Sequence, residues 1–460
     1  MTDQGWPLVG DGLPVPCLDG RQRPYLSLDS AASTAALPAV ADAVTAFLPW
    51  YSSVHRGAGY KSQLATGAYE DARQAALRFA GRAGSDDVAI ICRNTTEAIN
   101  HLAYRLRFTP ADVILTTVAE HHANLLPWGR LGATRRFVEC GPAGTFTVDD
   151  VIAALDQGPT PSLLAITGAT NVTGWMPPID DIVEAAHRRG TQVVLDAAQL
   201  AAHRPMPTSA DFVAWSGHKM YAPFGAGVLI GPREAFSDGD PFLAGGGAVD
   251  LVDLDEVVWT DPPEREEAGS PNVIGAVALG AAIGELESIG WEAIVAHEDE
   301  LARRLRAGVA AIPDVQLLGP SLDVETLAVA TFVVTGVPHQ LVAARLSAEH
   351  AIGVRHGCFC AHPYLIRLLD LPRDVVDRFR ADVLAGDRRN IPGAVRASAG
   401  ISVTVADIDR FLAALASIAS GDPAPVKYRQ DPITGDYWPE GDAAPWSSGD
   451  GRAGTPCAPT

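Results

Sequence analysis

Short apolar runs alternate with longer segments of helical periodicity between Asp87 and Gly231. Short apolar runs bounded by polar or turn residues are typical of strands that are buried on both faces, and intervening helical patterns are typical of βαβ units. We therefore predict a mainly parallel sheet with helices on both faces. The clearest predicted strands are residues 88–91, 113–115, 163–166, 193–195 and 212–215.

The second half of the chain has a different pattern. A helical periodicity from Ile274 to Ala311 predicts one long helix that leaves the large domain, and residues 327–334 then resemble a strand. Helical patterns at 341–347 and 405–418 complete a smaller α+β domain. We expect residues 1–27 to join the small domain as an N-terminal segment, 28–285 to form the large domain, 286–420 the small domain, and 421–460 an irregular tail rich in Pro and Gly.

Polar residues follow the predicted strands at their carboxyl ends, where ligands collect in open α/β sheets. Ser216-Gly217-His218-Lys219 ends the run Asp211 to Trp215. A lysine at the end of a buried strand must be desolvated or paired, and a desolvated lysine is the residue type that forms Schiff bases with carbonyl groups. Most lysines are solvated surface groups, so Lys219 alone does not establish chemistry.

Three other positions have two interpretations each. Thr95 and Thr96 open a helical pattern and suit a phosphate site, although the same pattern fits an ordinary N-cap. Asp196 could hold a pyridinium nitrogen protonated or cap the next helix. His121, beside His122, could stack on an aromatic cofactor and exchange protons near neutral pH; the pair could also bind metal, but no second ligand cluster accompanies it, so we expect no metal.

Composition limits the classes of partner. The chain has 460 residues, 47% apolar and 20% charged, with a net charge of −20. This charge argues against binding nucleic acid or an anionic membrane through the general surface. No segment resembles a signal peptide or a membrane span, so we expect a cytoplasmic protein. Six cysteines in a chain of this length do not form a disulfide framework, but Cys358 and Cys360 stand apart as a close pair.

The motifs together resemble the class V aminotransferases, which depend on pyridoxal 5′-phosphate (PLP), and within them the cysteine desulfurases. The resemblance also extends to the N-terminal domain of molybdenum cofactor sulfurases. It implies the type I fold of PLP-dependent transferases, a large α/β/α domain plus a smaller α+β domain. The segments that carry it are Leu28-Asp29-Ser30-Ala31-Ala32, Ser53-Val54-His55-Arg56-Gly57, Thr95-Thr96-Glu97-Ala98-Ile99-Asn100, Glu120-His121-His122-Ala123-Asn124, Asn171-Val172-Thr173-Gly174, Asp196-Ala197-Ala198-Gln199, Ser216-Gly217-His218-Lys219, Ala268-Gly269-Ser270-Pro271-Asn272, Arg355-His356-Gly357-Cys358-Phe359-Cys360-Ala361 and Arg396-Ala397-Ser398.

The resemblance implies a role for each matching residue. Lys219 would attach the cofactor and carry the substrate α-proton. Arg396, Asn171 and Arg355 would bind the substrate, Arg396 by a bidentate grip on its carboxylate. The cofactor would be held by Thr95, Thr96, His121, Asp196, Gln199, Ser216, His218 and Ser270. Of these, His121 would stack on the ring, Asp196 would pair with the ring nitrogen, and Ser270 would reach in from the second subunit of a homodimer.

Cys360 occupies the place of the thiol that takes sulfur from cysteine in the resembled desulfurases, which would leave a persulfide and alanine. Cations such as Arg355 favour the reactive thiolate form. A buried structural cysteine remains an alternative. Transamination, C–S lysis or epimerisation of another amino acid, and a non-catalytic scaffold, are the rival functions. The resemblance leaves open the sulfur acceptor, which could be a protein or a small molecule, and whether Cys358 is the reactive thiol instead.

Three features depart from the resembled pattern. The stretch from Tyr364 to Ala394 looks longer than usual, with residues 365–369 in a helical pattern, and could cover the mouth of the site. Glu266 stands where an aromatic residue is common, which predicts a more polar substrate wall. Asn94 replaces a glycine, a change that asparagine tolerates because it enters left-handed backbone conformations more readily than most residues.

Overall fold

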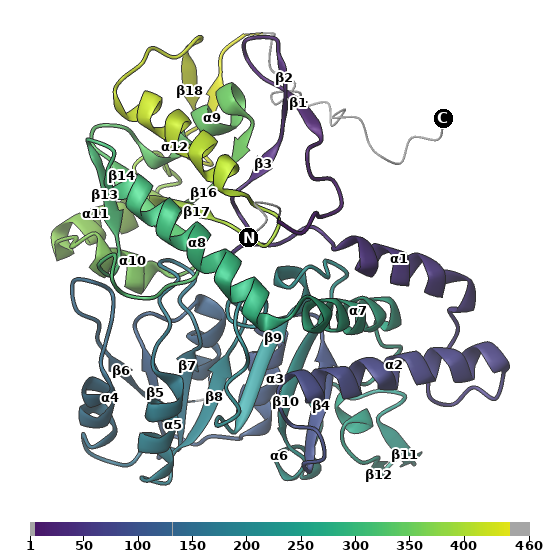
Figure 1. Ribbon diagram of the computed structural model, residues 1–460. Helices are drawn as coiled ribbons and strands as arrows, with labels where there is room; N and C mark the ends of the chain where they lie inside the picture. Colours follow the sequence, from purple (N-terminus) through teal and green to yellow (C-terminus); the bar gives the residue numbers. More distant parts are fainter. Residues whose placement is uncertain (1–4, 131, 442–460) are drawn as a thin grey trace.

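A seven-stranded sheet forms the centre of the larger part of the molecule in the computed structural model (Figure 1), which describes residues 5–130 and 132–441. Its strand order is β4-β10-β9-β8-β7-β5-β6. The four pairings from β9 to β6 are parallel, whereas β10 pairs antiparallel with both β9 and β4. The strands are β4 (Asp87–Cys92), β5 (Val113–Thr117), β6 (Thr134–Val138), β7 (Leu163–Thr167), β8 (Gln192–Asp196), β9 (Phe212–Ser216) and β10 (Gly227–Pro232).

Helices cover both faces of this sheet. Helix α3 (Thr95–Arg105) packs on one face with Trp128 and Phe236 in a separate buried cluster. The opposite face carries the largest core cluster, because β7, β8 and β9 are buried along nearly their whole length and present side chains to both sides. The helices around that cluster are α1 (Pro38–Phe47), α2 (Tyr60–Phe79), α4 (Val148–Leu155), α5 (Ile179–His187) and α7 (Val273–Ile289).

A four-stranded antiparallel sheet, in the order β13-β14-β17-β16, forms the second, smaller part of the fold. Its own core contains Phe332 and Phe411. Its strands are β13 (Val315–Leu318), β14 (Val329–Val334), β16 (Arg355–Gly357) and β17 (Ala394–Ser398), and its helices are α8 (Trp291–Ala310), α9 (His339–His350) and α12 (Val405–Ala419). The predicted fold class, a large α/β domain with a smaller α+β domain, is confirmed, while the exact domain boundaries stay a prediction.

The segments near both ends of the described chain pair with or pack against elements of the small part of the fold. Near the N-terminus, β1 (Pro14–Pro16) pairs with β2 (Gln22–Pro24), and β3 (Leu26–Ser27) pairs in parallel with β15 (Ile352–Gly353). Near the other end, β18 (Tyr428–Gln430) and β19 (Tyr437–Pro439) form an antiparallel hairpin, and β19 packs against α9. An irregular tail from residue 421 was therefore the wrong prediction for this hairpin; residues 442–460 of that tail lie outside the described residues.

The single long helix predicted from Ile274 to Ala311 is also wrong. Helix α7 ends at Ile289 and α8 begins at Trp291, and the two axes meet at an angle of 84°. Gly290 joins them with a φ of +89°, a left-handed conformation that glycine adopts without a steric penalty. No single described helix is long and apolar enough to cross a membrane; α7 and α8 pass that test only when they are joined.

The connection from Tyr364 to Ala394 contains two helices. Helix α10 (His362–Leu368) is anchored to the large domain, because the Tyr364 hydroxyl donates to the Gly144 carbonyl (2.8 Å) and lies 3.0 Å from Thr173 Oγ1. Helix α11 (Arg373–Leu384) has no buried residue. The helical pattern at residues 365–369 thus belongs to α10, at the end of the segment that carries Cys360.

Candidate active site

A single cavity of about 280 Å³ lies where the large and small parts of the fold meet, at the carboxyl ends of the parallel strands. Asp196 ends β8, Ser216 ends β9, and Lys219 lies in the short helical turn that follows β9. Arg396 enters from the small sheet on β17. Twelve of the thirteen predicted site residues line the cavity: Thr95, Thr96, His121, Asn171, Asp196, Gln199, Ser216, His218, Lys219, Arg355, Cys360 and Arg396.

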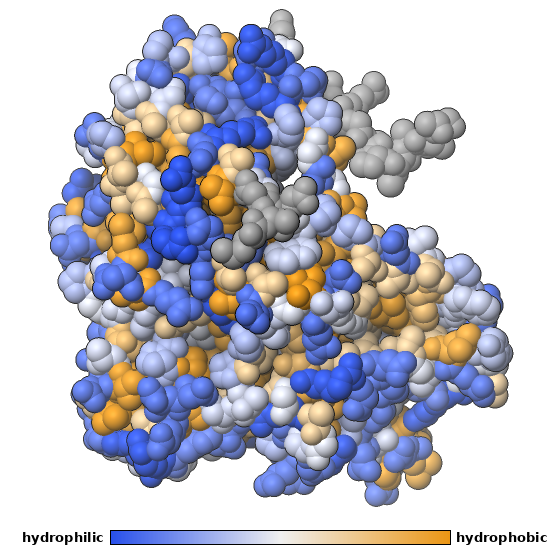
Figure 2. Space-filling view, in the orientation of Figure 1, coloured by the Kyte–Doolittle hydropathy of each residue, from blue (hydrophilic) through white to orange (hydrophobic). Residues whose placement is uncertain are grey.

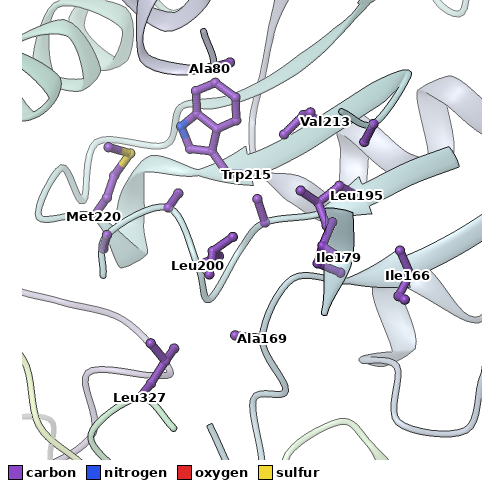
Figure 3. Close-up of a cluster of buried hydrophobic side chains, with 14 of the residues drawn as sticks. Ala80, Ile166, Ala169, Ile179, Leu195, Leu200, Val213, Trp215, Met220 and Leu327 are labelled. Carbon is purple, nitrogen blue, oxygen red and sulfur yellow. The ribbon is translucent and has the colours of Figure 1, made fainter. Parts of the chain in front are cut away.

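The turn that carries Lys219 rests on a tightly packed part of the core (Figure 3). Trp215 is fully buried, and its ring centroid lies 5.8 Å from that of Phe79. Met220 lies in the same cluster, immediately after Lys219. Close packing on both sides of the lysine fixes the backbone from which its side chain enters the cavity.

Burial dominates the electrostatics of the Lys219–Asp196 pair. Desolvation lowers the pKa of Lys219 to about 8, although the Asp196 carboxylate acts in the opposite direction. Desolvation also raises the pKa of Asp196. Asp196 Oδ1 accepts the Ala198 N–H (2.9 Å), which leaves Oδ2 for a bound group. About a tenth of Lys219 is therefore a neutral, nucleophilic amine at pH 7, far more than for a lysine with an ordinary pKa.

This lowered pKa gives a direct prediction for the cofactor-free protein. The rate at which acetic anhydride modifies Lys219 should rise with pH and reach half of its maximum at about pH 8. Lys61 and Lys427 are the other lysines of the chain and serve as internal references in the same digest. Mass spectrometry of the labelled peptides measures all three profiles. A midpoint for Lys219 near the ordinary lysine value would contradict the proposed desolvation.

The helix α3 N-terminus lies beside Lys219 and is partly satisfied by the protein itself. The Thr95 N–H donates to Ser216 Oγ (2.7 Å), and the Glu97 N–H donates to Asn94 Oδ1 (3.0 Å). The Thr96 N–H lies between these two and remains for an anionic ligand. The N-cap interpretation is confirmed, since Asn94 caps α3. The phosphate site stays a prediction, and Thr95 and Thr96 line the cavity where it would lie.

Asn94 is not left-handed, contrary to the explanation offered for its replacement of glycine: its φ is −173°, an extended conformation open to any residue. The glycine that this corner requires is Gly227 on β10. A Cβ atom at Gly227 would lie 2.6 Å from the Asn94 Cα atom, closer than real Cβ contacts allow. The close approach of β10 therefore places the α3 N-terminus against the cavity.

The two cavity histidines are neutral. Burial, reinforced by Lys219, lowers the pKa of His121 to about 3, and burial lowers that of His218 to about 4. His121 Nδ1 accepts the Ala123 N–H (3.0 Å), so the proton of the neutral ring is on Nε2. A pKa this low argues against the predicted proton exchange of His121 near neutral pH, whereas a neutral ring suits stacking on an aromatic group.

Arg396 is the main cation on the small-domain side of the cavity. It is buried, its Nη1 donates to the Asn171 carbonyl (2.7 Å), and its Nη2 contacts Asp29 (3.2 Å). Its Nε has no hydrogen-bond partner among the described residues, and neither has Asn171 Oδ1. Desolvation lowers the pKa of Arg396 to about 10 even with Asp29 beside it. An anionic ligand would compensate this charge.

Several site residues were missed from the sequence. Asp29 contacts both Arg396 (3.2 Å) and Arg355 (3.2 Å), and Glu120 is a fully buried carboxyl group behind the sheet. Glu120 Oε1 accepts the Thr167 N–H (3.1 Å), and Thr167 pairs in register with Asp196. Burial raises the pKa of Glu120 to about 8. Asp29 and Glu120 both lie in sequence motifs described above, but a motif alone does not show which residues a side chain contacts in the fold.

Ser270 and Glu266 lie away from this cavity in the same chain. Ser270 lines a separate pocket with Tyr51, His55 and Gly247. Glu266 is buried, with Oε2 at 2.6 Å from His101 Nε2 and Oε1 at 3.4 Å from Arg105 Nε. The predicted polar substrate wall at Glu266 is therefore wrong for this cavity, because the carboxylate is used inside the large domain.

Known proteins match most of the chain. The family described as "Aminotransferase class-V" matches residues 26–411. A probable cysteine desulfurase from Vibrio cholerae is 33% identical, with 85% of this chain and 93% of that protein covered. "Probable cysteine desulfurase 1" from Mycobacterium leprae is 37% identical over 75% of this chain, which spans only 57% of that longer protein.

Solved structures agree with the sequence matches. A cysteine desulfurase from Thermococcus onnurineus has a TM-score of 0.77 at 32% identity, covering 86% of this chain and 95% of its own. One from Escherichia coli has a TM-score of 0.72 at 30% identity, covering 85% and 94%. The matched residues include every motif around the cavity, and the chain therefore belongs to the aminotransferase class-V family.

Proposed function

We propose that the protein is a PLP-dependent cysteine desulfurase, which takes sulfur from L-cysteine to give alanine and a persulfide on Cys360. The single observation that carries this proposal is the cavity itself, which is lined by both an exposed cysteine and a buried lysine of lowered pKa. The relatives named as cysteine desulfurases at 33–37% identity support it. The two cysteine desulfurase structures support the same reaction class.

The cavity residues fit PLP as the resident cofactor. Lys219 supplies a nucleophilic amine, Oδ2 of Asp196 is free to pair with a ring nitrogen, and the Thr96 N–H at the α3 N-terminus suits a phosphate. The neutral rings of His121 and His218 complete the aromatic and polar surroundings. When bound, PLP supplies the electron sink that stabilises negative charge at the substrate α-carbon. Lys219 is the described residue placed to accept and return the α-proton.

An amino acid carboxylate fits the unpaired Nε of Arg396. Nη1 uses one of its two N–H groups on the Asn171 carbonyl and Nη2 uses one on Asp29. The fork is therefore oriented before substrate arrives, and each Nη keeps a second N–H group. We propose that Nε and an adjacent Nη hold the carboxylate, with the Asn171 amide beside it. The Arg396 guanidinium also lies over the Phe359 ring at 5.1 Å, which fixes its plane.

Replacing Arg396 with lysine should raise the KM for L-cysteine by about a hundredfold, because a point charge cannot reproduce a buried bidentate grip. Steady-state kinetics of alanine formation measures KM and kcat separately. The matched variant is Arg355→Lys, whose side chain is half exposed beside the same Asp29; its effect should stay within about fivefold. Equal effects of the two substitutions would contradict the assigned role of Arg396.

The product of the wild-type reaction tests the proposed function. Purified protein loaded with PLP should convert L-cysteine, in the presence of dithiothreitol, to equal amounts of alanine and sulfide. Pyruvate with sulfide would instead indicate a C–S lyase, and a keto acid without sulfide would indicate an aminotransferase. L-Alanine in place of L-cysteine is the control for background sulfide.

We further propose that the active form is a homodimer in which Ser270 completes the partner's cofactor site. Exposed apolar side chains gather on the segment from the end of α1 to the start of α2, where Tyr51 also lines the pocket of Ser270. Others lie on the hairpin of β11 (Val249–Val252) and β12 (Val257–Trp259) (Figure 2). Arg56 Nη2 joins the two regions through the Val249 carbonyl (2.6 Å). Leu251 is 65% exposed and Leu254 is 98% exposed, which favours a covering partner.

The double substitution Leu251→Asp and Leu254→Asp should convert dimers to monomers and lower the affinity for PLP, because charges would be buried at the interface. Sedimentation velocity measures the first effect, and equilibrium dialysis of PLP measures the second. Leu384→Asp is the control, since Leu384 is 80% exposed on α11, in another part of the molecule. A wild-type protein that sediments as a monomer would contradict the dimer.

A further inference from the structure

Cys358 and Cys360 lie in one tight turn between β16 and α10. The Ala361 N–H donates to the Cys358 carbonyl (2.9 Å), which closes a four-residue turn. Its two central residues, Phe359 and Cys360, have φ values of +56° and +54°. Positive φ at both positions is the pattern of a type I′ turn, and side chains other than glycine adopt it only under constraint.

The large domain holds this turn in place from two sides. The Asn171 Nδ2 donates to the Phe359 carbonyl (2.6 Å), and the His122 N–H donates to the Cys360 carbonyl (2.8 Å). The Phe359 ring is packed under Arg396. These contacts fix the unfavourable backbone, so the two cysteines keep a constant relative position.

The spacing of the two residues suits a bond between them. Neighbouring Cα atoms are about 3.8 Å apart. In a bend, the Cα atoms of two residues separated by one other residue, such as Cys358 and Cys360, therefore come within the roughly 4.4–6.8 Å that disulfides span. The Cys358–Ala361 turn puts the two cysteines at its first and third positions, so both side chains start from the same bend. The backbone geometry of this turn is the sign of a dithiol pair.

The two thiols have different surroundings. Cys360 is exposed and lines the cavity, whereas Cys358 is half-buried against the main core cluster and does not line it. Burial raises the pKa of Cys358, so its reactive thiolate fraction is small. Cys358 is therefore a slow nucleophile toward molecules in solution, but its fixed position beside Cys360 gives it a high effective concentration there.

We propose that Cys358 is a resolving thiol, which discharges the Cys360 persulfide when no acceptor collects its sulfur. This proposal rests on the proposed function, because that reaction supplies the persulfide. The Cys358 sulfur attacks the Cys360 Sγ: a bond forms between the two Sγ atoms, and the bond from Cys360 Sγ to the outer sulfur breaks. The two thiol sulfurs become a disulfide, the outer sulfur leaves as sulfide, and the Cys358 proton goes to it.

This step needs no external oxidant, because the outer sulfur of the persulfide is reduced to sulfide while the two cysteine sulfurs are oxidised to the disulfide. It also sets a limit on turnover. Each discharge leaves a disulfide that blocks Cys360 until a dithiol reduces it. The protein would then release free sulfide once per reduction and would otherwise pass sulfur to an acceptor.

The first experiment is a single turnover without reductant. The pre-reduced, PLP-loaded protein is mixed anaerobically with one equivalent of L-cysteine, and alanine, sulfide and the intact protein mass are measured. The wild type should release sulfide in proportion to alanine and become lighter by two hydrogen atoms. The Cys358→Ser variant should retain the outer sulfur, become heavier by one sulfur atom, and show a ratio of sulfide to alanine at least tenfold lower. A wild type that keeps the persulfide, or equal ratios in both proteins, would overturn the proposal.

Two controls separate this idea from the proposed function and from other cysteines. All variants carry Cys457→Ser, because Cys457 lies outside the described residues, and Cys140→Ser is the matched variant of a half-buried cysteine.

The second experiment needs no turnover: the protein is equilibrated with oxidised and reduced glutathione, and loss of the Cys358 and Cys360 thiols is followed by peptide mapping. Paired loss as an internal disulfide supports the resolving thiol even if no alanine forms. Separate glutathione adducts on the two cysteines would overturn it.

Discussion

Replacing Lys219 with alanine should lower the rate of alanine formation from L-cysteine by at least about ten-thousandfold, because in the proposed function this one amine both attaches the cofactor and carries the α-proton. Among the described residues, Lys219 is the lysine that lines the cavity, so no neighbour can take over its role. The measurement is the initial rate at saturating PLP. Dialysis of the variant should also remove the cofactor that the wild type retains.

The matched variant is Lys219→Arg, which keeps the positive charge but lacks an amine that can lose its proton at neutral pH. We expect it to be as inactive as Lys219→Ala. Activity within tenfold of the wild type would show that charge alone is required at this position, and would remove the chemical role assigned to the amine.

The free energy of unfolding shows whether Lys219→Ala loses activity because it misfolds. The folded pKa of Lys219, about 8, lies below the unfolded value, so the folded state binds fewer protons than the unfolded state between about pH 8 and the ordinary lysine pKa. The free energy of unfolding of the cofactor-free wild type therefore rises with pH in that window. Lys219→Ala removes this dependence and should be at least as stable at pH 7.

Much of the cavity lining could be predicted from the sequence, because several of its residues come from the ends of consecutive strands. In a parallel sheet those ends meet at one edge, so the positions of Asp196, Ser216 and Lys219 follow from the strand pattern alone. Arg396 and Cys360 lie in the small domain, and nothing in the local pattern brings them to that edge. Only the resemblance to a family placed them there.

The missed features all depend on tertiary contacts. The sharp bend at Gly290 was hidden because the apolar periodicity continues through it, and an isolated glycine inside a helical pattern is often tolerated. Glu266 was interpreted from its neighbours in sequence, but its partners His101 and Arg105 come from α3. The β18–β19 hairpin lies in a segment of low apolar content, where packing against α9 overrides the composition.

The exposed thiol of Cys360 lines the same cavity as the amine of Lys219 and the guanidinium of Arg396. Replacing Cys360 with alanine should therefore lower alanine formation by at least about a hundredfold, since no other thiol lines the cavity among the described residues. Chemistry that ends in transamination or β-elimination does not use this thiol. Such products should survive the substitution.

Product analysis of the Cys360→Ala variant with L-cysteine thus distinguishes the candidate reactions. Loss of alanine with PLP still bound assigns the sulfur-accepting step to Cys360, because the cofactor residues are untouched. Cys140→Ser, which alters a half-buried thiol away from the cavity, should keep the wild-type rate. If Cys360→Ala formed alanine as fast as the wild type, sulfur would have to leave without a protein thiol, and both the persulfide and its resolution by Cys358 would have to be abandoned.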